Sequence, residues 1–557
     1  MNKLSVVFYW HMHQPFYRDA VSQEYILPWV YLHAMKDYTD MASIVKACPE
    51  AKVVFNFVPS LSIQIDHYAQ AIDAWLHRNE AMPDPLLQLL AKEDAYTEVE
   101  RAFLMSTCFR LNHERNMLGY PSYNRLWQMK EQVENHQASD YLDNLFFCDL
   151  VCWYHLGWMA QTLRDTHPLV SRLMKEGRDF SIRDRHALIS LIGELMHDIP
   201  KNYRALVEGG QAEISTTPYA HPIMPLMLDF NTARETIADA NIPAESYPDG
   251  EARAVDHIRL AQEVHAKNFG DEASGCWPAE GAVSQKTVEL LSDAGFRWCA
   301  TGEAVLHHSL KANIRATDVR QLYQPWRVAD SETVCFFRDD NLSDLLGFEY
   351  SRWDTQHAVD NFMHELSLIR ERTIDMKNPV VSIIMDGENA WEHYHENAVP
   401  FLTNLYQAIV DHDDYDMTTF SDYLDASQQV APKLDHMVAG SWVYGNLSTW
   451  IGDQAKTRAW ELLIDAKKAL DSQLNSLDEV QSEAALEQLR ICEGSDWCWW
   501  FGDYNAGDVV RDFDQLYRRH LSKIYEIIGL DIPQELQQTI SEGNEDASAD
   551  GTMRKNS

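Results

Sequence analysis

The chain has 557 residues, of which 85 are acidic and 47 are basic, so its formal net charge is −38. A charge of this size repels nucleic acids and anionic membrane surfaces, which leaves neutral molecules as the expected partners. The length allows a large core and two or three structural units. Its 17 tryptophans and 24 tyrosines include candidates for stacking on flat sugar rings, although most of them are expected in the core.

Nine cysteines, an odd number, are scattered without the paired spacing of a metal site. No apolar run approaches the length that spans a membrane, and the N-terminus enters a strand without a small-residue cleavage site. We therefore expect a cytoplasmic protein that binds no metal or other cofactor.

The first part of the chain alternates apolar runs with polar loops. Residues 4–10 form a strand candidate that leads into His11, His13 and Gln14, and residues 52–58 form a second strand candidate. Helical periodicity then dominates residues 63–209. We interpret that block as a helical insertion into the surrounding fold.

After residue 210 the alternation of strands and helices resumes and continues to about residue 424. Repeated strand, polar loop and helix predict a mostly parallel α/β sheet, and over this length a barrel is the leading form. The strand candidates are residues 211–217, 275–281, 296–301, 333–337 and 380–385, and the helix candidates include residues 284–294, 360–373 and 398–411.

The strand at residues 380–385 ends abruptly in Asp386, Glu388 and Trp391. Charges are costly to bury, so we expect them at the exposed carboxyl end of the strand, where α/β barrels gather their catalytic residues. Asp386 and Glu388 are therefore candidates for catalysis.

Residues 425–540 show mainly helical periodicity, at 457–474, 478–492 and 512–528, and predict a C-terminal α-helical domain. Between two of these helices lies a loop, residues 493–503, that contains Asp496 and Trp497. It is either a core plug or an aromatic platform folded back over the barrel. Residues 541–557 are polar and acidic, and we expect them to be a disordered tail.

Five short segments, taken together and in order, resemble glycoside hydrolase family 57. They begin at His11, Gly210, Gly275, Met385 and Ser495 and read HMHQP, GQAE followed by HP, GCWPAE, MDGENAW and SDWCWW. The resemblance implies an incomplete (β/α)7 barrel, spanning residues 1–424 with the insertion, and a C-terminal helical bundle. It also implies a retaining mechanism with Glu280 as nucleophile and Asp386 as general acid/base.

Around these two carboxyl groups we expect a set of substrate-binding residues. Glu213 could instead pair with a core arginine, each tryptophan could be packing, and the two histidines of the first segment could begin a metal site, although two ligands do not complete one. The expected set is His11, His13, Gln14, Glu213, His221, Trp277, Trp391, Asp496 and Trp497.

The leading hypothesis is a hydrolase that cleaves the α-1,4 bonds, and possibly the α-1,6 bonds, of glycogen, starch or maltodextrins. The same glycosyl-enzyme could pass its sugar to another sugar, which would make the protein a 4-α-glucanotransferase or a branching enzyme. A different class would be a metal-dependent hydrolase or deacetylase with His11, His13 and Asp386 around zinc. A non-catalytic glycan-binding protein is the remaining alternative, against which the presence of both Glu280 and Asp386 argues.

Overall fold

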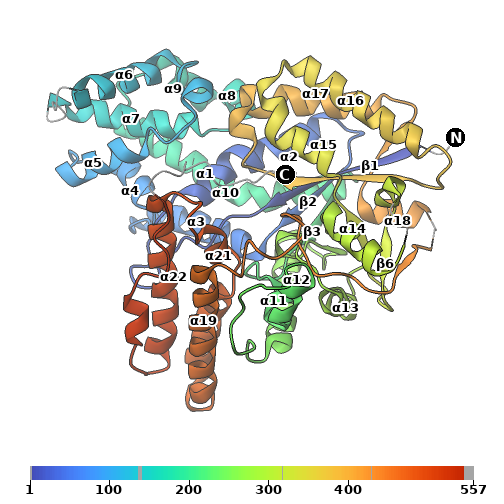
Figure 1. Cartoon of the computed structure of the whole chain (residues 1–557). Helices are drawn as coiled ribbons and strands as arrows, with labels where there is room; N and C mark the ends of the chain where they lie inside the picture. Colours follow the sequence, from blue (N-terminus) through green and yellow to red (C-terminus); the bar gives the residue numbers. More distant parts are fainter. Residues whose placement is uncertain (1–2, 136–140, 316–317, 428–429, 545–557) are drawn as a thin grey trace.

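The computed structural model describes residues 3–135, 141–315, 318–427 and 430–544, and its centre is a sheet of parallel strands (Figure 1). Seven of the strands follow one another in the order β7-β5-β4-β3-β2-β1-β8. A single bridge between Arg338 and Ser382 links the end of β7 to β8, so the sheet curls into an incompletely closed barrel. The seven strands are β1 (Leu4–Met12), β2 (Val53–Phe57), β3 (Ala212–Thr216), β4 (Gly275–Cys276), β5 (Trp298–Thr301), β7 (Val334–Phe337) and β8 (Val380–Asp386).

This arrangement confirms the predicted (β/α)7 barrel. Three short strands that the sequence analysis did not predict extend the sheet: β6 (Trp326–Val328), β9 (Tyr415–Met417) and β10 (Lys433–Leu434). β6 is antiparallel to β7, β10 pairs with β6, and β9 pairs with the first residues of β1. The predicted strand at residues 275–281 is shorter than expected, because Pro278 follows β4 and begins a turn.

Aromatic side chains fill the inside of the barrel. Tyr9 packs edge-to-face against Trp298 and Phe420, with ring centroids 5.5 and 5.6 Å apart. These rings belong to a buried cluster separate from the larger core between the strands and the helices. Because both faces of each strand are buried, the strands read as continuous apolar runs.

Helices cover the outside of the barrel. The predicted helix at residues 284–294 is α13 (Gln285–Asp293), which Ser284 caps by accepting a hydrogen bond from the backbone of Thr287. The other helices around the barrel are α1 (Trp29–His33), α2 (Thr39–Ala47), α11 (Met224–Leu228), α12 (Gly250–Phe269), α14 (Glu303–Ala312), α15 (Asp340–Asp344), α16 (Thr355–Arg372), α17 (Val399–Val410) and α18 (Phe420–Ser427).

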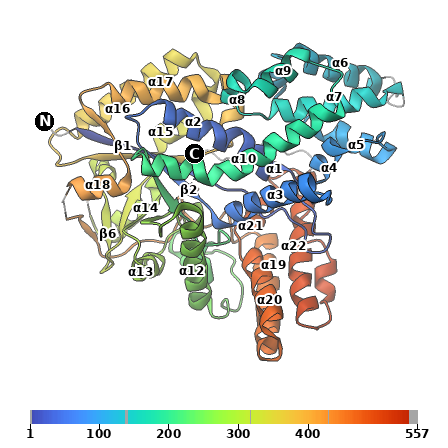
Figure 2. The ribbon, with the colours of Figure 1, turned by 180° about the vertical axis from the view of Figure 1, so that it is seen from behind.

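The block between β2 and β3 is helical, as its periodicity predicted. The long helices α3 and α10 pack against each other, and in the reverse view α10 lies across the sheet (Figure 2). None of the helices in the described parts of the chain combines the length with the apolar character that a membrane crossing requires. The block contains α3 (Pro59–Arg78), α4 (Pro85–Ala91), α5 (Glu98–Thr107), α6 (Pro121–Asn135), α7 (Asn144–Gly157), α8 (Gln161–Thr166), α9 (Pro168–Glu176) and α10 (Ile182–Glu208).

The C-terminal helices extend from one side of the barrel (Figure 1). They are α19 (Gln454–Gln473), α20 (Glu479–Cys492), the single-turn α21 (Asp496–Trp500) and α22 (Gly507–Ile527). The first residues of the predicted tail are packed: the hydroxyl of Ser541 accepts a hydrogen bond from the backbone of Gly502, and Asn544 bridges to Ala506. The rest of that predicted tail, 545–557, lies outside the described residues.

Candidate active site

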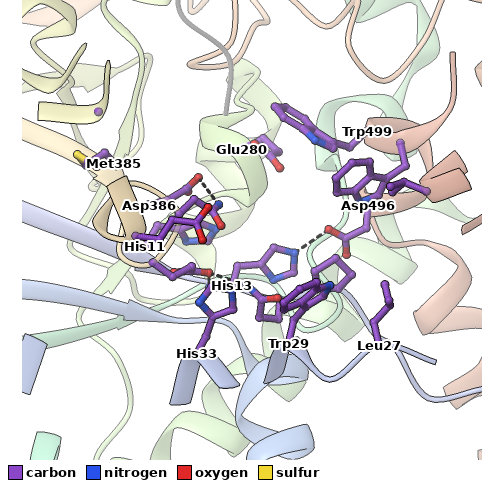
Figure 3. Close-up of a pocket in the computed structure, with 18 of the residues that line it drawn as sticks. His11, His13, Leu27, Trp29, His33, Glu280, Met385, Asp386, Asp496 and Trp499 are labelled. Atoms are coloured by element: carbon purple, nitrogen blue, oxygen red, sulfur yellow. Dashed lines mark hydrogen bonds and ion pairs between the residues drawn. The ribbon is translucent and has the colours of Figure 1, made fainter. Parts of the chain in front are cut away.

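A cavity of about 600 Å³ opens at the carboxyl ends of the barrel strands (Figure 3). Residues that follow β1, β4, β7 and β8 line it, among them His13, Glu280, Arg338 and Asp386. Parallel strands of a barrel end at the same rim, so residues far apart in the sequence meet there. The predicted nucleophile and the predicted acid/base therefore line one cavity.

Glu280 lies in a turn with φ 57° and ψ 25°, a left-handed conformation that few side-chain-bearing residues adopt. Its Oε2 accepts a 3.0 Å hydrogen bond from the indole of Trp442. The backbone N–H of Trp442 donates to the carbonyl oxygen of Glu280 at 3.2 Å. One tryptophan therefore fixes both the backbone and the carboxyl group of Glu280.

Asp386 is the last residue of β8 and pairs in register with His11 of β1. The backbone N–H of Gly387 donates to the carbonyl oxygen of His11 at 2.8 Å. A Cβ atom at Gly387 would lie 2.2 Å from the sulfur of Met12, so a larger residue would displace the Met12 side chain. The turn after β8 is thus closed against β1, which sets the direction of the Asp386 side chain.

Both carboxyl groups are harder to ionise than usual. Burial and the neighbouring Asp386 raise the pKa of Glu280 to about 7, while the hydrogen bond from Trp442 acts in the opposite direction. Burial raises the pKa of Asp386 to about 6, against the effects of Asn389, His13 and Arg338. Around neutral pH the two groups therefore tend to retain a proton between them, which suits a pair that must supply one acid and one base.

Three histidine rings lie one beside the next, and two of them, His11 and His13, line the cavity. The rings of His13 and His221 stack with centroids 3.9 Å apart, and those of His221 and His11 with centroids 5.2 Å apart. Each ring has one fixed partner: His11 Nδ1 lies 2.6 Å from Asn56 Oδ1, His13 Nε2 lies 2.8 Å from Asp496 Oδ1, and His221 Nδ1 lies 2.8 Å from Ser495 Oγ.

These contacts favour a positive charge on His13 alone. Burial lowers the pKa of His13, but Asp496, Glu280 and Asp386 outweigh that effect and raise it above its usual value. Burial and the nearby His13 charge lower the pKa of His11 to about 3, and they also lower the pKa of His221. His13 is therefore the cation that partly balances the carboxyl groups of the cavity.

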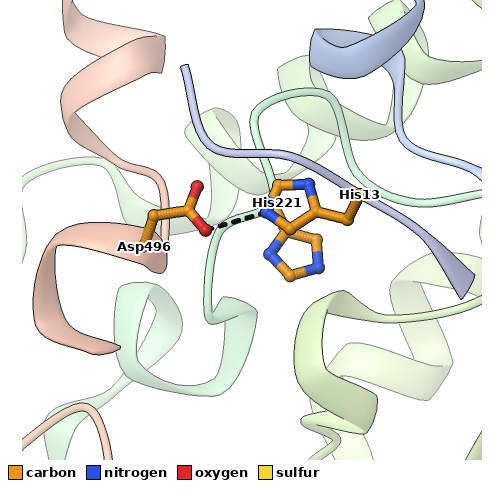
Figure 4. Close-up of side chains that lie close together, drawn as sticks. All are labelled: His13, His221 and Asp496. Carbon is orange, nitrogen blue, oxygen red and sulfur yellow. Dashed lines mark hydrogen bonds and ion pairs between the residues drawn. The ribbon is translucent and has the colours of Figure 1, made fainter. Parts of the chain in front are cut away.

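Asp496 reaches His13 from the C-terminal helical region (Figure 4). The segment before it is held by Glu493, whose buried carboxylate accepts hydrogen bonds of 2.8 and 2.7 Å from Arg253 and lies 2.7 Å from the Nε2 atom of His257. Burial alone would raise the pKa of Glu493, but these two partners lower it well below its usual range. An ion cluster thus joins the C-terminal region to α12 and positions Asp496.

Five predicted substrate-binding residues do not line the cavity: Glu213, His221, Trp277, Trp391 and Trp497. The indole of Trp391 donates to the carbonyl oxygen of Gly387 at 2.8 Å, and that of Trp497 to the carbonyl oxygen of Ile491 at 2.9 Å. Trp277 packs behind Trp442, with ring centroids 5.0 Å apart. In this structure these tryptophans hold loop backbone or core, which corrects their interpretation as stacking platforms.

Glu213 lies inside the barrel, near the start of β3. Its carboxylate accepts hydrogen bonds from the indole of Trp298 at 2.8 Å and from the hydroxyl and backbone of Ser421 at 2.6 and 2.9 Å. The alternative that Glu213 pairs with a core arginine is not seen among the contacts of this described residue. The cavity lies at the other end of the strands, so Glu213 does not reach it. Its hydrogen bonds instead stabilise the barrel interior.

Several cavity residues were missed by the sequence analysis. Arg338 follows β7 just as Asp386 ends β8, so the same pattern of an apolar run followed by a charge could have identified it. The others lie on helices or in loops, where no local pattern distinguishes them from packing residues; they include Trp29, His33, Trp158 and Trp442. Trp499 and Trp500 also line the cavity, and they belong to the loop at residues 493–503 that was predicted to be either a core plug or an aromatic platform.

In the described parts of the chain, the side chains whose possible metal-ligand atoms lie within 4.8 Å of one another are His13, His221 and Asp496. This trio differs from His11, His13 and Asp386, the set of the metal-dependent alternative. The rings of His13 and His221 are stacked at an interplanar angle of 20°, so their in-plane lone pairs run side by side. A tetrahedral zinc ion needs lone pairs that converge on one point, which this arrangement does not provide.

The parallel barrel places Glu280 and Asp386 in one cavity at the carboxyl ends of its strands, which fits the pair of carboxyl groups that glycosidases use. The sequence model of the family "Glycosyl hydrolase family 57" matches residues 7–435, and the chain belongs to this family. No curated protein matches the sequence.

Solved structures of related fold agree with this membership. A GH57 branching enzyme from Thermococcus kodakaraensis is 15% identical, with 96% of this chain and 93% of that chain covered and a TM-score of 0.58. A GH57-type branching enzyme from Pyrococcus horikoshii is 14% identical, with both chains fully covered and a TM-score of 0.57. An α-amylase from Thermotoga maritima is 13% identical, with 95% and 93% covered and a TM-score of 0.57. At these identities the likeness concerns the fold.

Proposed function

We propose that the protein is a retaining enzyme of α-glucans that cleaves α-1,4-glucosidic bonds through a glycosyl-enzyme intermediate, with α-1,6 bonds as a second linkage to be tested. The observation that carries the proposal is the meeting of Glu280 and Asp386 in one buried cavity whose walls include Trp29, Trp442 and Trp499. Two carboxyl groups perform the chemistry, and indole rings suit the flat faces of sugar rings. Glycogen, starch and maltodextrins are the substrates expected, in the cytoplasm.

In this mechanism Glu280 attacks the anomeric carbon while Asp386 protonates the leaving oxygen. Asp386 then removes a proton from the incoming water or sugar hydroxyl, which displaces Glu280 and retains the configuration. Burial raises the pKa of both carboxyl groups, so the protonation of the free enzyme does not distinguish their roles. The division of roles follows the family motifs, and a separate experiment tests it.

Azide supplies that test, because it can replace water or the nucleophile without needing a general base. With Asp386→Ala, azide should attack the glycosyl-enzyme and give an α-glycosyl azide, in which the configuration is retained. With Glu280→Ala, azide should attack the substrate directly and give the β-anomer. The opposite pair of products would exchange the two roles, and no azide product from either variant would argue against a glycosyl-enzyme.

Product analysis tests the reaction class. Maltoheptaose and glycogen are incubated with the wild type, Glu280→Gln and Asp386→Asn, and reducing ends and chain lengths are followed together. New reducing ends with shorter products, lost in both variants, identify a hydrolase. Redistributed or branched chains without new reducing ends identify a 4-α-glucanotransferase or a branching enzyme. No change in either glucan would refute the proposal.

A further inference from the structure

Glu388 is a further carboxyl residue that lines the cavity, two residues beyond Asp386, and it is only 2% exposed. Its Oε1 accepts hydrogen bonds from the backbone N–H of His13 at 3.2 Å, the amide of Gln14 at 3.1 Å and the hydroxyl of Tyr38 at 3.4 Å. Its Oε2 is equally buried and has no hydrogen-bond partner in the described parts of the chain. The two oxygens of one carboxyl group therefore have opposite environments.

The amide of Gln14 is occupied on both sides. Its nitrogen donates to Glu388, and its oxygen accepts a 3.1 Å hydrogen bond from the hydroxyl of Tyr17. Gln14 was expected to bind substrate, but these bonds show that it holds Glu388. Glu388 in turn joins the loop after β1 to the loop after β8, the two loops that carry His13 and Asp386.

The cations near Glu388 are engaged elsewhere. His13 forms its ion pair with Asp496, and the guanidinium of Arg338 donates to Asp340 and Asp344. The π-helical segment Ala34–Tyr38 and the helix before it contribute Lys36, Asp37, Tyr38 and His33, and Asp37 pairs with Lys36 at 3.2 Å and with His33 at 2.6 Å. Tyr17 and Tyr203, the latter on α10, are further titratable groups near Glu388.

An ionised Glu388 would thus be a buried anion with no cation bonded to it and with one oxygen unpartnered, beside Asp386 and Asp37. Buried charges persist in proteins when they are paired and fully hydrogen-bonded, and otherwise the group stays neutral. A protonated carboxyl group fits the observed asymmetry, because its carbonyl-type oxygen accepts hydrogen bonds while the other oxygen carries the proton.

We propose that Glu388 keeps its proton throughout the working range of the enzyme and acts as a neutral positioning residue: Oε1 holds the His13 and Gln14 loop, and the proton on Oε2 avoids a further negative charge beside Asp386. Burial and Asp386, with a smaller effect from Asp37, raise the pKa of Glu388 well above its usual value, which agrees with the geometry. The proposal concerns a residue without a role in the mechanism above, and its first test does not depend on any activity.

That test is infrared difference spectroscopy of the wild type against Glu388→Gln at about pH 8.5, well above the pKa of an ordinary carboxyl group. We expect the variant to lack a band of a protonated carboxyl group that the wild type shows. Loss of carboxylate bands instead would overturn the proposal. Should the variant fail to fold, Glu280→Gln gives a second measurement, because it removes the carboxyl group of raised pKa at Glu280 and keeps Asp386 beside Glu388; a protonated band must survive at this pH, and its absence would refute the proposal.

A kinetic test rests on the proposed function and separates positioning from mere packing. Glu388→Gln replaces one neutral acceptor by another, so the limbs of its pH profile of kcat/KM should coincide with those of the wild type within about 0.3 unit. Glu388→Ala removes the acceptor and should lose at least tenfold in kcat/KM. An ionised Glu388 would instead raise the pKa of Asp386, so its replacement by glutamine would move the alkaline limb to lower pH by about one unit. Equal activity of both variants would exclude a positioning role.

Discussion

Replacement of Trp442 by phenylalanine isolates the indole hydrogen bond to Glu280. The bond is 3.0 Å long and ends on a buried carboxyl oxygen, where it favours the ionised form. A hydrogen bond to a charged group contributes about 1.5–3 kcal/mol. If Glu280 must be ionised to attack, its loss should lower kcat/KM near neutral pH by roughly 10- to 150-fold.

The sign of the pH effect follows from the same bond. Without the indole donor the carboxylate is less stable, so the pKa of Glu280 rises and the acidic limb of the kcat/KM profile moves to higher pH by about one to two units. Trp277→Phe is the matched control, because Trp277 packs on Trp442 and is itself fully buried, while its indole nitrogen has no hydrogen-bond partner in the described residues. Thermal unfolding of both variants gives the cost of lost packing.

The reasoning fails if the two variants behave alike. Equal losses of activity would mean that Trp442 acts through packing, and an unmoved acidic limb in Trp442→Phe would mean that Glu280 is not the group that must be ionised. A shifted alkaline limb would instead assign the role of proton donor to Glu280.

Three further results are expected. Glu493→Gln should lower the free energy of unfolding, measured by denaturant titration, by about 3–5 kcal/mol, because it breaks a buried ion cluster. The pKa of Glu493 is lower in the folded state than in the unfolded state. The difference in stability is therefore full above about pH 5 and shrinks as the pH falls below the unfolded-state pKa, which is near 4.3. Asp496→Asn should lower the pKa of His13, and the lost cation should raise the pKa of Asp386 and move the alkaline limb of kcat/KM to higher pH. Trp29→Ala should reduce kcat/KM by roughly 2- to 12-fold for long maltooligosaccharides and leave the shortest substrates unaffected, as expected for a ring across the cavity from Glu280 (Figure 3).

Much of the barrel could be predicted because each strand is buried on both faces. The apolar runs at residues 4–10 and 380–385 correspond to β1 and β8, which pair in register from Ser5 with Val380 to His11 with Asp386. The short strands β6, β9 and β10 were missed, since two or three residues carry no measurable periodicity. That Glu280 and Asp386 lie near each other was predictable, because parallel strands end at one rim. Which other residues line the cavity was not predictable.

The error at Glu213 has a physical explanation that was visible in the sequence. Glu213 is the second residue of β3, so it lies at the amino end of the strand, whereas the cavity lies at the carboxyl end. A charge near the start of a buried strand can be satisfied inside the barrel, here by Trp298 and Ser421. Position within the strand, more than membership in a motif, therefore distinguishes an interior carboxylate from a catalytic one.

The tryptophans near the site have two different roles, holding loop backbone or hydrogen-bonding Glu280, and the motifs do not distinguish them. Trp391 and Trp497 lie within the motifs, yet their indoles donate to the carbonyl oxygens of Gly387 and Ile491 and fix the loops on which the chemical groups sit. Trp442 lies outside every motif, yet it donates directly to Glu280. A loop held by its own tryptophan needs a particular local sequence, which makes the motif recognisable. A donor that arrives from a distant segment needs only its position in space, and that position is set by the whole fold.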